Sequence, residues 1–191
     1  MLKYTGYIRK IRYYSESSHY IVALLEVEED QELLTMNGYM SNFNDYDKYA
    51  FYGDFEIHPK YGQQFKLDHY EIVLSTDEEE IIKYLSSPLF KGIGPTQAKY
   101  IVDALGENAL SLIKEDKHHL DLVKGMTVAK RELIYEVLTS NDYDQEVTQF
   151  FMGHGISLRH IGIIQETYKE KTLEILQNHP YQLVEDIEGI G

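Results

Sequence analysis

The chain has 191 residues, of which 43% are hydrophobic, and a formal net charge of −14 at pH 7. It contains no cysteine, which excludes a disulfide framework and a thiolate metal site. No apolar run approaches the ~20 residues of a membrane span, and the N-terminus lacks the apolar core of a signal peptide, so a cytoplasmic protein is expected. The acidity argues against a broad nucleic-acid-binding surface, so any polyanion must be bound through a few local sites.

Residues 1–75 are expected to form β-strands. Four stretches are rich in Tyr, Ile, Val and Leu with partial alternation, namely "YTGYIRKIRYY", "HYIVALLEVEE", "ELLTMNGYM" and "QQFKLDHYEIVL". "SNFNDYDKY" and "HPKYG" supply loop residues between them. Four or five short strands in this length predict a small β-barrel of the oligonucleotide-binding (OB) type.

The pattern becomes helical after residue 75. Thr76 is expected to cap a helix that has acidic residues in its first turn. One apolar helix face is formed further on by Ala98, Ile101, Val102 and Leu105. Gly106 should end that helix. The predicted fold class is therefore α+β, with a barrel over 1–75 and two helical modules over 76–140 and 141–191.

The helical half repeats itself. "GIGPTQAKYIVDALGENALSLI" (92–113) aligns with "GISLRHIGIIQETYKEKTLEIL" (155–176) at an offset of 63 residues, and "LVKGMT" aligns with "DIEGIG" at the end of the chain. Each repeat thus holds two glycine hairpins, which is typical of stacked supersecondary units. Because the fourth hairpin has no helix after it, we expect the second module to be truncated and the chain to be the N-terminal piece of a longer protein.

The first of these turns, "FKGIGPTQAKYIV", has the composition of a helix-hairpin-helix motif. Gly92 and Gly94 can adopt positive φ and leave the backbone uncovered. The turn would then point N–H groups outward at the positive end of the next helix, which is a seat for a phosphate oxygen. Pro95 suits the first helical position. Such contacts carry no sequence information.

The other hairpins depart from this pattern, because Thr127 and Ser157 replace the second glycine. The fourth hairpin is flanked by acidic residues and is expected to serve packing. The candidate nucleic-acid-binding residues are Lys91, Gly92, Ile93, Gly94, Thr96, Lys99, Lys124, Gly125, Thr127, Lys130, Arg131, Gly155, Ser157 and Arg159. The competing interpretation is that each glycine turn only lets two helices pack closely.

The barrel region offers a second kind of candidate. Of the 17 tyrosines, 11 lie in residues 1–76. Tyr13 and Tyr14 could stack on unpaired bases while the neighbouring Arg9, Lys10 and Arg12 hold the strand. The alternative is ordinary half-buried strand packing, which Tyr favours. "HPKYGQQF" (58–65) is expected to shape a turn rather than a binding site.

Catalytic signatures are missing from the sequence. It contains no G-x-x-x-x-G-K-[ST] phosphate loop, no H-x-x-x-H metal pair and no nucleophile elbow. We therefore predict no catalytic residue, no metal ligand and no cofactor within these residues.

Three stretches resemble the N-terminal region of long-form RecD-like bacterial DNA helicases, which act without RecB and RecC partners. They are "GYIRKIRYYSESSHYIVALLEV", "HPKYGQQFKLDHYE" and "YLSSPLFKGIGPTQAKYIVDALGENAL", with "NHPYQLVEDIEGIG" as a further match. The resemblance implies an OB-like barrel, tandem helix-hairpin-helix modules and, in the full protein, an ATP- and Mg-dependent 5′–3′ motor. A similar layout in the RuvA junction-binding protein is a second resemblance.

Two functions follow from these observations. The leading hypothesis is a non-catalytic accessory region that binds single-stranded or forked DNA non-specifically in repair or recombination. The rival is a protein-docking module that contacts the helicase motor domains, or another replication or repair protein, and does not bind DNA.

Overall fold

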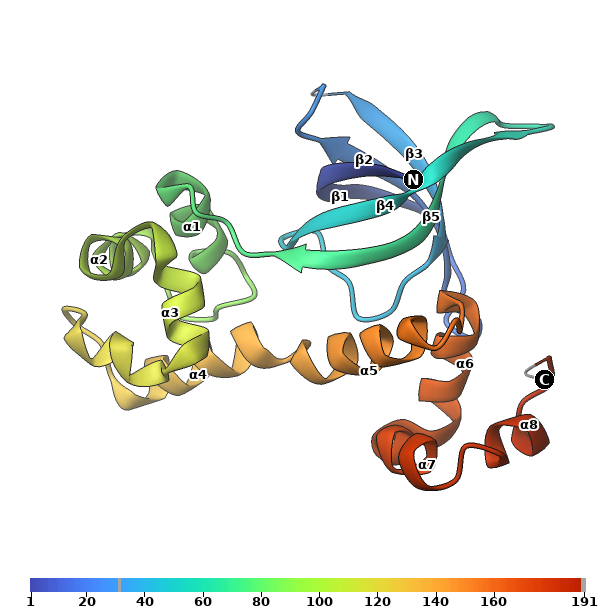
Figure 1. Cartoon of the computed structure of the whole chain (residues 1–191). Helices are drawn as coiled ribbons and strands as arrows, with labels where there is room; N and C mark the ends of the chain where they lie inside the picture. The colour runs from blue at the N-terminus through green and yellow to red at the C-terminus, as the bar shows by residue number, and fades with distance from the viewer. Residues whose placement is uncertain (31, 190–191) are drawn as a thin grey trace. The chain divides into compact units, whose positions relative to one another are not determined.

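Five strands close into a barrel in the computed structural model, which describes residues 1–30 and 32–189 (Figure 1). The strands are β1 (Leu2–Tyr14), β2 (Tyr20–Val27), β3 (Leu33–Tyr39), β4 (Lys48–His58) and β5 (Gly62–Val73). Their order is β1-β2-β3-β5-β4, and β1 pairs with β4 to complete the closure. The β3–β5 pair is parallel, whereas β1–β2, β2–β3 and β1–β4 are antiparallel. The barrel expected from the strand pattern is thus confirmed.

The barrel interior is filled by alternate residues of its strands. The fully buried side chains include those of Ile21, Ala23, Leu25, Met36 and Phe65. Their spacing of two in β2 follows from the period-2 geometry of a strand, which sends every second side chain to one face. This alternation is the reason that the "YIVALLEV" stretch could be assigned from sequence.

Strand β4 was not identified from the sequence. It begins inside the stretch "SNFNDYDKY" that is expected to form a loop, and it carries Gly53, a residue type of low strand propensity, at its centre. Gly53 is required by geometry, because a Cβ atom placed there would lie 2.0 Å from the carbonyl oxygen of Lys66. The requirement for close backbone approach overrides the low strand propensity of glycine.

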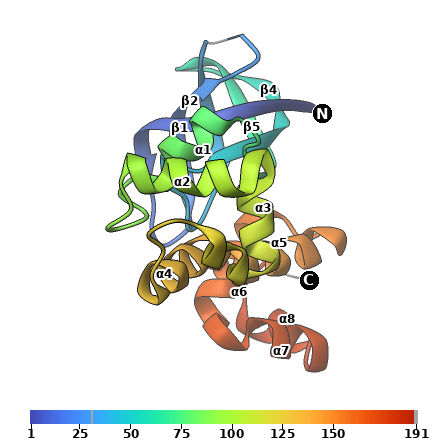
Figure 2. The same ribbon diagram turned by 90° about the vertical axis from the view of Figure 1, so that its left-hand side faces the viewer.

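Four α-helices and two 3₁₀ helices follow the barrel: α1 (Glu78–Leu85), α2 (Pro95–Leu105), η1 (Gly106–Asn108), α3 (Ala109–Glu115), η2 (Lys117–Leu122) and α4 (Val128–Thr139) (Figure 2). Asp77, not Thr76, caps α1, since its side chain accepts a hydrogen bond from the Glu80 amide. Ala98, Ile101 and Val102 of α2 enter the core of this region, and Gly106 ends α2 as expected.

The remaining helices are α5 (Asp142–Gly153), α6 (Leu158–Tyr168), η3 (Lys169–Lys171), α7 (Thr172–Asn178) and α8 (Gln182–Asp186). They share a second core built on Val147, Phe151, Ile161 and Ile164. Part of the predicted fourth hairpin lies outside the described residues, since Ile190 and Gly191 are not among them. Within the described ranges, no helix has the length and apolar character needed to cross a membrane.

The repeat expected at an offset of 63 residues appears in the helices themselves. Helix α6 begins and ends 63 residues after α2, and η3 and α7 follow η1 and α3 at the same offset. The neighbourhood of the glycines repeats as well. A Cβ placed on Gly125 would lie 3.3 Å from Gln97, and one placed on Gly189 would lie 3.7 Å from His160, which occupies the position equivalent to Gln97. Each module therefore sets its second glycine turn beside the start of its first hairpin helix.

One position of the repeat carries strain. Gly106 ends α2 with φ 76°, whereas Lys169 ends α6 with φ 50° and ψ −122°. A side chain disfavours this region by on the order of 1–3 kcal/mol. We expect Lys169→Gly to stabilise the chain by about 1 kcal/mol in urea unfolding and Gly106→Lys to destabilise it. If neither variant changed the free energy of unfolding, the backbone at Lys169 would not be strained.

The chain divides into two compact units. The first unit comprises Met1–Asp45, Tyr49–Glu71 and Tyr143–Gly191, and the second unit comprises Tyr46–Lys48 and Ile72–Asp142. Within the first unit, α6 packs on the barrel, where a Cβ on Gly162 would lie 2.7 Å from Cδ2 of His19. The barrel and the second helical module therefore fold against each other, although the sequence divides them by residues 76–140.

Candidate nucleic-acid interface

The first glycine hairpin lies in the second unit, between α1 and α2. Gly92 has φ 84°, and Gly94 has φ −91° and ψ 176° and is the N-cap of α2. Only Gly92 thus adopts the positive φ that was expected of both glycines. Between them, the Ile93 side chain is 4% exposed and belongs to the core, and the Ile93 amide donates to the Phe90 carbonyl at 3.2 Å. Ile93 anchors the turn and has no amide left for a ligand.

The backbone on either side of Ile93 is open. Within the described part of the chain, the amides of Gly92, Gly94, Thr96 and Gln97 donate no hydrogen bond to the protein, and no side chain caps α2. A Cβ placed on Gly92 or Gly94 would meet no atom within 4 Å. These amides therefore form an uncovered donor cluster at the positive end of an 11-residue helix. We call it the first amide seat.

The second hairpin has the same turn with one change. Gly125 has φ 77°, and the Met126 amide donates to Val123 O at 3.2 Å, as Ile93 does to Phe90. Helix α4 is capped by Thr127, whose hydroxyl accepts from the Lys130 amide at 3.2 Å. Thr127, which replaces the second glycine, therefore accepts a hydrogen bond from the Lys130 amide. The equivalent amide of the first hairpin, that of Gln97, is open.

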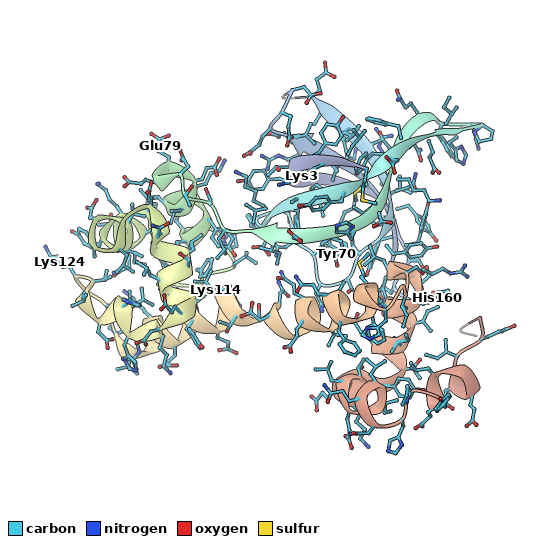
Figure 3. The ribbon with its side chains drawn as sticks, viewed as in Figure 1. Lys3, Tyr70, Glu79, Lys114, Lys124 and His160 are labelled. Atoms are coloured by element: carbon cyan, nitrogen blue, oxygen red, sulfur yellow. The ribbon has the colours of Figure 1, made fainter. Side chains whose placement is uncertain are left out.

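The first and second hairpins are neighbours. The Gln97 side-chain amide donates to the Lys124 carbonyl at 3.0 Å, which joins the start of α2 to the second turn. Figure 3 shows the Lys124 side chain projecting outward from the turn before α4. Its ammonium also lies 5.3 Å from the centre of the Tyr100 ring of α2. Two glycine turns and their lysines thus share one edge of the second unit.

The cations around these turns are not equivalent. Lys91 and Lys124 are exposed and form no ion pair among the described residues. Lys99 pairs with Asp103 at 3.1 Å. Arg131 is held by Asp121 at 2.9 Å and by Glu132 at 3.0 Å, so its guanidinium is already paired within the protein. Lys130 forms no ion pair among the described residues either, but it is half-buried, so Lys91 and Lys124 are the fully exposed, unpaired cations of these two turns.

The first three hairpins are free of acidic residues although the protein is acidic. No Asp or Glu occurs in residues 81–102 or 122–131, and none occurs in residues 147–165 around the third hairpin. The net charge of −14 is thus carried by other segments. This distribution reconciles the overall acidity with local anion sites, because exposed charges act mainly within about 10 Å at moderate salt.

The ion-pair cluster around Arg131 predicts acid sensitivity. Hydrogen bonds from Arg131 and His118 lower the pKa of Asp121, and those from Lys117 and Arg131 lower the pKa of Glu132. A lowered pKa contributes stability above the ordinary values, 3.8 and 4.5, which is lost as the pH falls through the folded-state values.

We expect the second unit to lose hydrogen-exchange protection below about pH 5. The Arg131→Gln variant, which removes the partner shared by both carboxylates, should lose less protection on the same change of pH. If the variant and the parent chain lost equal protection as the pH falls, the ion-pair cluster would not be the cause of the acid sensitivity.

The third hairpin has a different turn. Gly155 has φ 78°, but its amide donates to Met152 O at 3.0 Å, and Ser157 caps α6 without a side-chain hydrogen bond to the backbone. The Ser157 hydroxyl lies 3.2 Å from Nδ1 of His160, and Arg159 is exposed. The Gly155 amide is therefore bonded within the protein, whereas the equivalent amide of the first seat, that of Gly92, is open.

The two predicted stacking tyrosines have different surroundings. Tyr13 is 57% exposed. Tyr14 is half-buried, its hydroxyl lies 2.9 Å from Nδ1 of His19 and donates to Met40 O, and its ring packs edge-on against Phe43. Tyr14 thus joins loop segments of the barrel, and Tyr13 is the better stacking candidate. The "HPKYG" stretch forms the expected turn, in which Nδ1 of His58 accepts the amides of Lys60 and Tyr61.

Sequence reasoning missed three residues. Gln97 was not singled out, although it contacts the second turn, and comparison with His160 at the equivalent repeat position was the signal that could have identified it. Tyr20 and Tyr39 were also overlooked. They are direct partners in the β2–β3 ladder, and only the register shows this.

Two matches to known families agree with this description. Residues 1–75 match the family described as "ATP-dependent DNA helicase YrrC, OB-fold domain". Residues 140–191 match the family described as "ATP-dependent RecD2 DNA helicase HHH domain". The first match covers the five-stranded barrel, and the second covers α5 to α8. The chain therefore belongs to the RecD-like DNA helicases and corresponds to their N-terminal region, with its OB-fold and helix-hairpin-helix domains.

Proposed function

We propose that this region is a DNA-binding accessory part of an ATP-dependent 5′–3′ helicase, and that the paired hairpins of the second unit hold DNA by its phosphates. The observation that carries this proposal is the first amide seat, whose open N–H groups at Gly92, Gly94, Thr96 and Gln97 lie in an acid-free segment. Backbone amides at a helix N-terminus bind phosphate oxygens.

Binding of this kind is independent of sequence. Backbone amides and lysines contact phosphates and read no base edges. The second turn, joined to the first through Gln97, adds Lys124 to the same edge. One phosphate at each turn would neutralise about two phosphate charges, so a fourfold rise in salt should weaken binding about tenfold.

The proposal extends to the whole helicase. Its motor domains would supply the ATP- and Mg-dependent chemistry, and this region would keep the motor on single-stranded or forked DNA during repair or recombination. Its partners would be DNA and those motor domains, in the cytoplasm.

A titration of fluorescein-labelled duplex and single-stranded DNA tests the proposal by fluorescence anisotropy. At about 50 mM salt, we expect dissociation constants between about 1 and 100 μM, with the affinity falling about tenfold at about 200 mM salt. Binding that does not change with salt would contradict phosphate contacts.

A protein-docking function is the second candidate, and one observation favours it. Leu122 and Val128 flank the second hairpin and are 77% and 65% exposed. Exposed apolar side chains beside a turn suit a protein partner such as the motor domains or another replication or repair protein. Absence of DNA binding at about 100 μM protein and about 50 mM salt would support this candidate.

A further inference from the structure

The first amide seat is joined to the end of α1 by a series of backbone turns. The Ser87 amide donates to the Tyr84 carbonyl, and the Phe90 amide donates to the Ser87 carbonyl, both at 3.1 Å. The Ile93 amide continues the series by donating to the Phe90 carbonyl at 3.2 Å. Because Ile93 anchors the seat, Tyr84 is the first support of the segment that carries it.

The side chain of Tyr84 supports the same segment a second time. Its ring packs edge-on against the ring of Phe90, with 5.1 Å between the ring centres and an interplanar angle of 78°. Phe90 is 1% exposed, so its ring is fixed in the core beneath the seat. The second hairpin differs here, because the carbonyl that accepts its Met126 amide belongs to Val123, which has no ring.

A buried carboxylate holds the Tyr84 hydroxyl. Asp47 is 4% exposed, and its Oδ1 accepts a hydrogen bond from this hydroxyl at 2.6 Å. Hydrogen bonds to an ionised acceptor are shorter and stronger than those between neutral groups. Asp47 comes from the barrel half of the sequence, but the segment Tyr46–Lys48 that contains it belongs to the second unit. A residue just before β4 therefore reaches the support of the first glycine turn.

We propose that Asp47 is a positioning residue for DNA binding, because it fixes the Tyr84 and Phe90 rings on which the first amide seat is built. The inference rests on the function proposed for that seat. Asp47 does not touch DNA in this account, since its carboxylate is buried and would repel a phosphate. It acts by holding the turn in the geometry that keeps the open amides aimed at one anion.

Lys48 offers a matched comparison. Its ammonium lies 3.2 Å from Oε2 of Glu80, so it joins the same segment to α1. Glu80 lies in the first turn of α1, whereas the seat follows the last turn. The Lys48–Glu80 pair should therefore stabilise the contact with α1 without setting the glycine turn.

Charge and geometry predict opposite effects for the two residues. Loss of the Asp47 carboxylate makes the protein less negative, so charge alone would strengthen binding to a polyanion, and loss of the Lys48 ammonium would weaken it. Geometry predicts weaker binding when Asp47 is lost and little change when Lys48 is lost. Weaker binding after removal of a negative charge is thus specific to a positioning role.

The Asp47→Ala variant tests the inference in the whole chain, with labelled duplex DNA as the probe. We expect binding to weaken about three- to tenfold in fluorescence anisotropy at low salt. Asp47→Asn keeps an oxygen acceptor for the Tyr84 hydroxyl and should restore the parent affinity. Tyr84→Phe removes only the donor and should act like Asp47→Ala. The two substitutions together should weaken binding no more than either alone, because they break the same hydrogen bond.

Spectra of the free protein give a second measurement. In a ¹H–¹⁵N correlation spectrum without DNA, Asp47→Ala should move the amide resonances of Gly92, Ile93 and Gly94. The Lys48→Gln control should leave them in place and should bind duplex DNA within about twofold of the parent chain. Circular dichroism establishes that each variant is folded, and Tyr84→Phe serves the same test if Asp47→Ala does not fold.

The inference is overturned if Asp47→Ala binds duplex DNA as tightly as the parent chain, if Lys48→Gln weakens binding equally, or if the resonances of the seat stay in place. The proposed function fails in a different way. A parent chain that does not bind duplex DNA would end the function of the seat, whereas the resonance shifts would still show that Asp47 sets the turn.

Discussion

Reversing the charge of Lys91 and Lys124 together should weaken duplex DNA binding by at least about tenfold at low salt. Each lysine lies beside one glycine turn, is exposed, and has no carboxylate partner among the described residues. Charge reversal removes two phosphate contacts and adds two repulsions. The slope of log affinity against log salt should therefore fall by about two. Fluorescence anisotropy over a salt series measures both quantities.

The control is a pair of reversals elsewhere. Lys60→Glu with Lys171→Glu lowers the net charge by the same amount and alters exposed lysines of the β4–β5 turn and of η3, in the first unit. It should change duplex affinity by less than about threefold, since neither lysine belongs to a glycine turn of the second unit. Equal losses in the two double variants would show a general charge effect and contradict the assignment to the hairpins.

The Gly53→Ala substitution should open the barrel. The added Cβ would lie 2.0 Å from the Lys66 carbonyl oxygen and 3.1 Å from Cζ of Phe65. The nearest atoms belong to the backbone of β5, so no side-chain rotation relieves the clash. We expect a loss of about 3 kcal/mol or more, seen as lost hydrogen-exchange protection in β1, β4 and β5.

Gly153→Ala is the matched substitution for this test. Gly153 ends α5, and a Cβ placed there would meet no atom within 4 Å. The same chemical change should leave barrel protection unaltered, with a gain in stability of up to about 1 kcal/mol. A barrel that keeps its protection in Gly53→Ala would contradict the close approach of β4 and β5.

The sequence predicted those elements that local pattern specifies. Alternation located β2, the apolar face of "AKYIVDAL" located α2, and the 63-residue offset located the second module with its 3₁₀ turn and following helix. Strand β4 was not predicted, because Gly53 is needed for the close approach of the β4 and β5 backbones, and no local sequence pattern shows this contact. The α1 cap was assigned one residue early, since Thr76 and Asp77 are both good capping residues and only the backbone decides between them.

The candidate interface was predictable in part. The glycine turn and its lysines can be read from "FKGIGPTQAK", but the state of each amide cannot. Geometry shows that Ile93 donates internally, that Thr127 occupies one donor of the second hairpin, and that Arg131 is held by two carboxylates. The pairing of these residues cannot be read from the sequence. Only the folded chain therefore distinguishes the exposed, unpaired Lys91 and Lys124 from cations such as Arg131 that are already paired.

An ¹H–¹⁵N correlation spectrum recorded during titration with a short DNA duplex tests the central claim most directly, because it follows each amide of the first seat. The amides of Gly92, Gly94, Thr96 and Gln97 should move downfield and saturate together, as N–H groups do when they donate to phosphate. The Ile93 amide, already bonded to Phe90, should move little. If DNA binds while these four resonances stay in place, the first amide seat does not hold the phosphate.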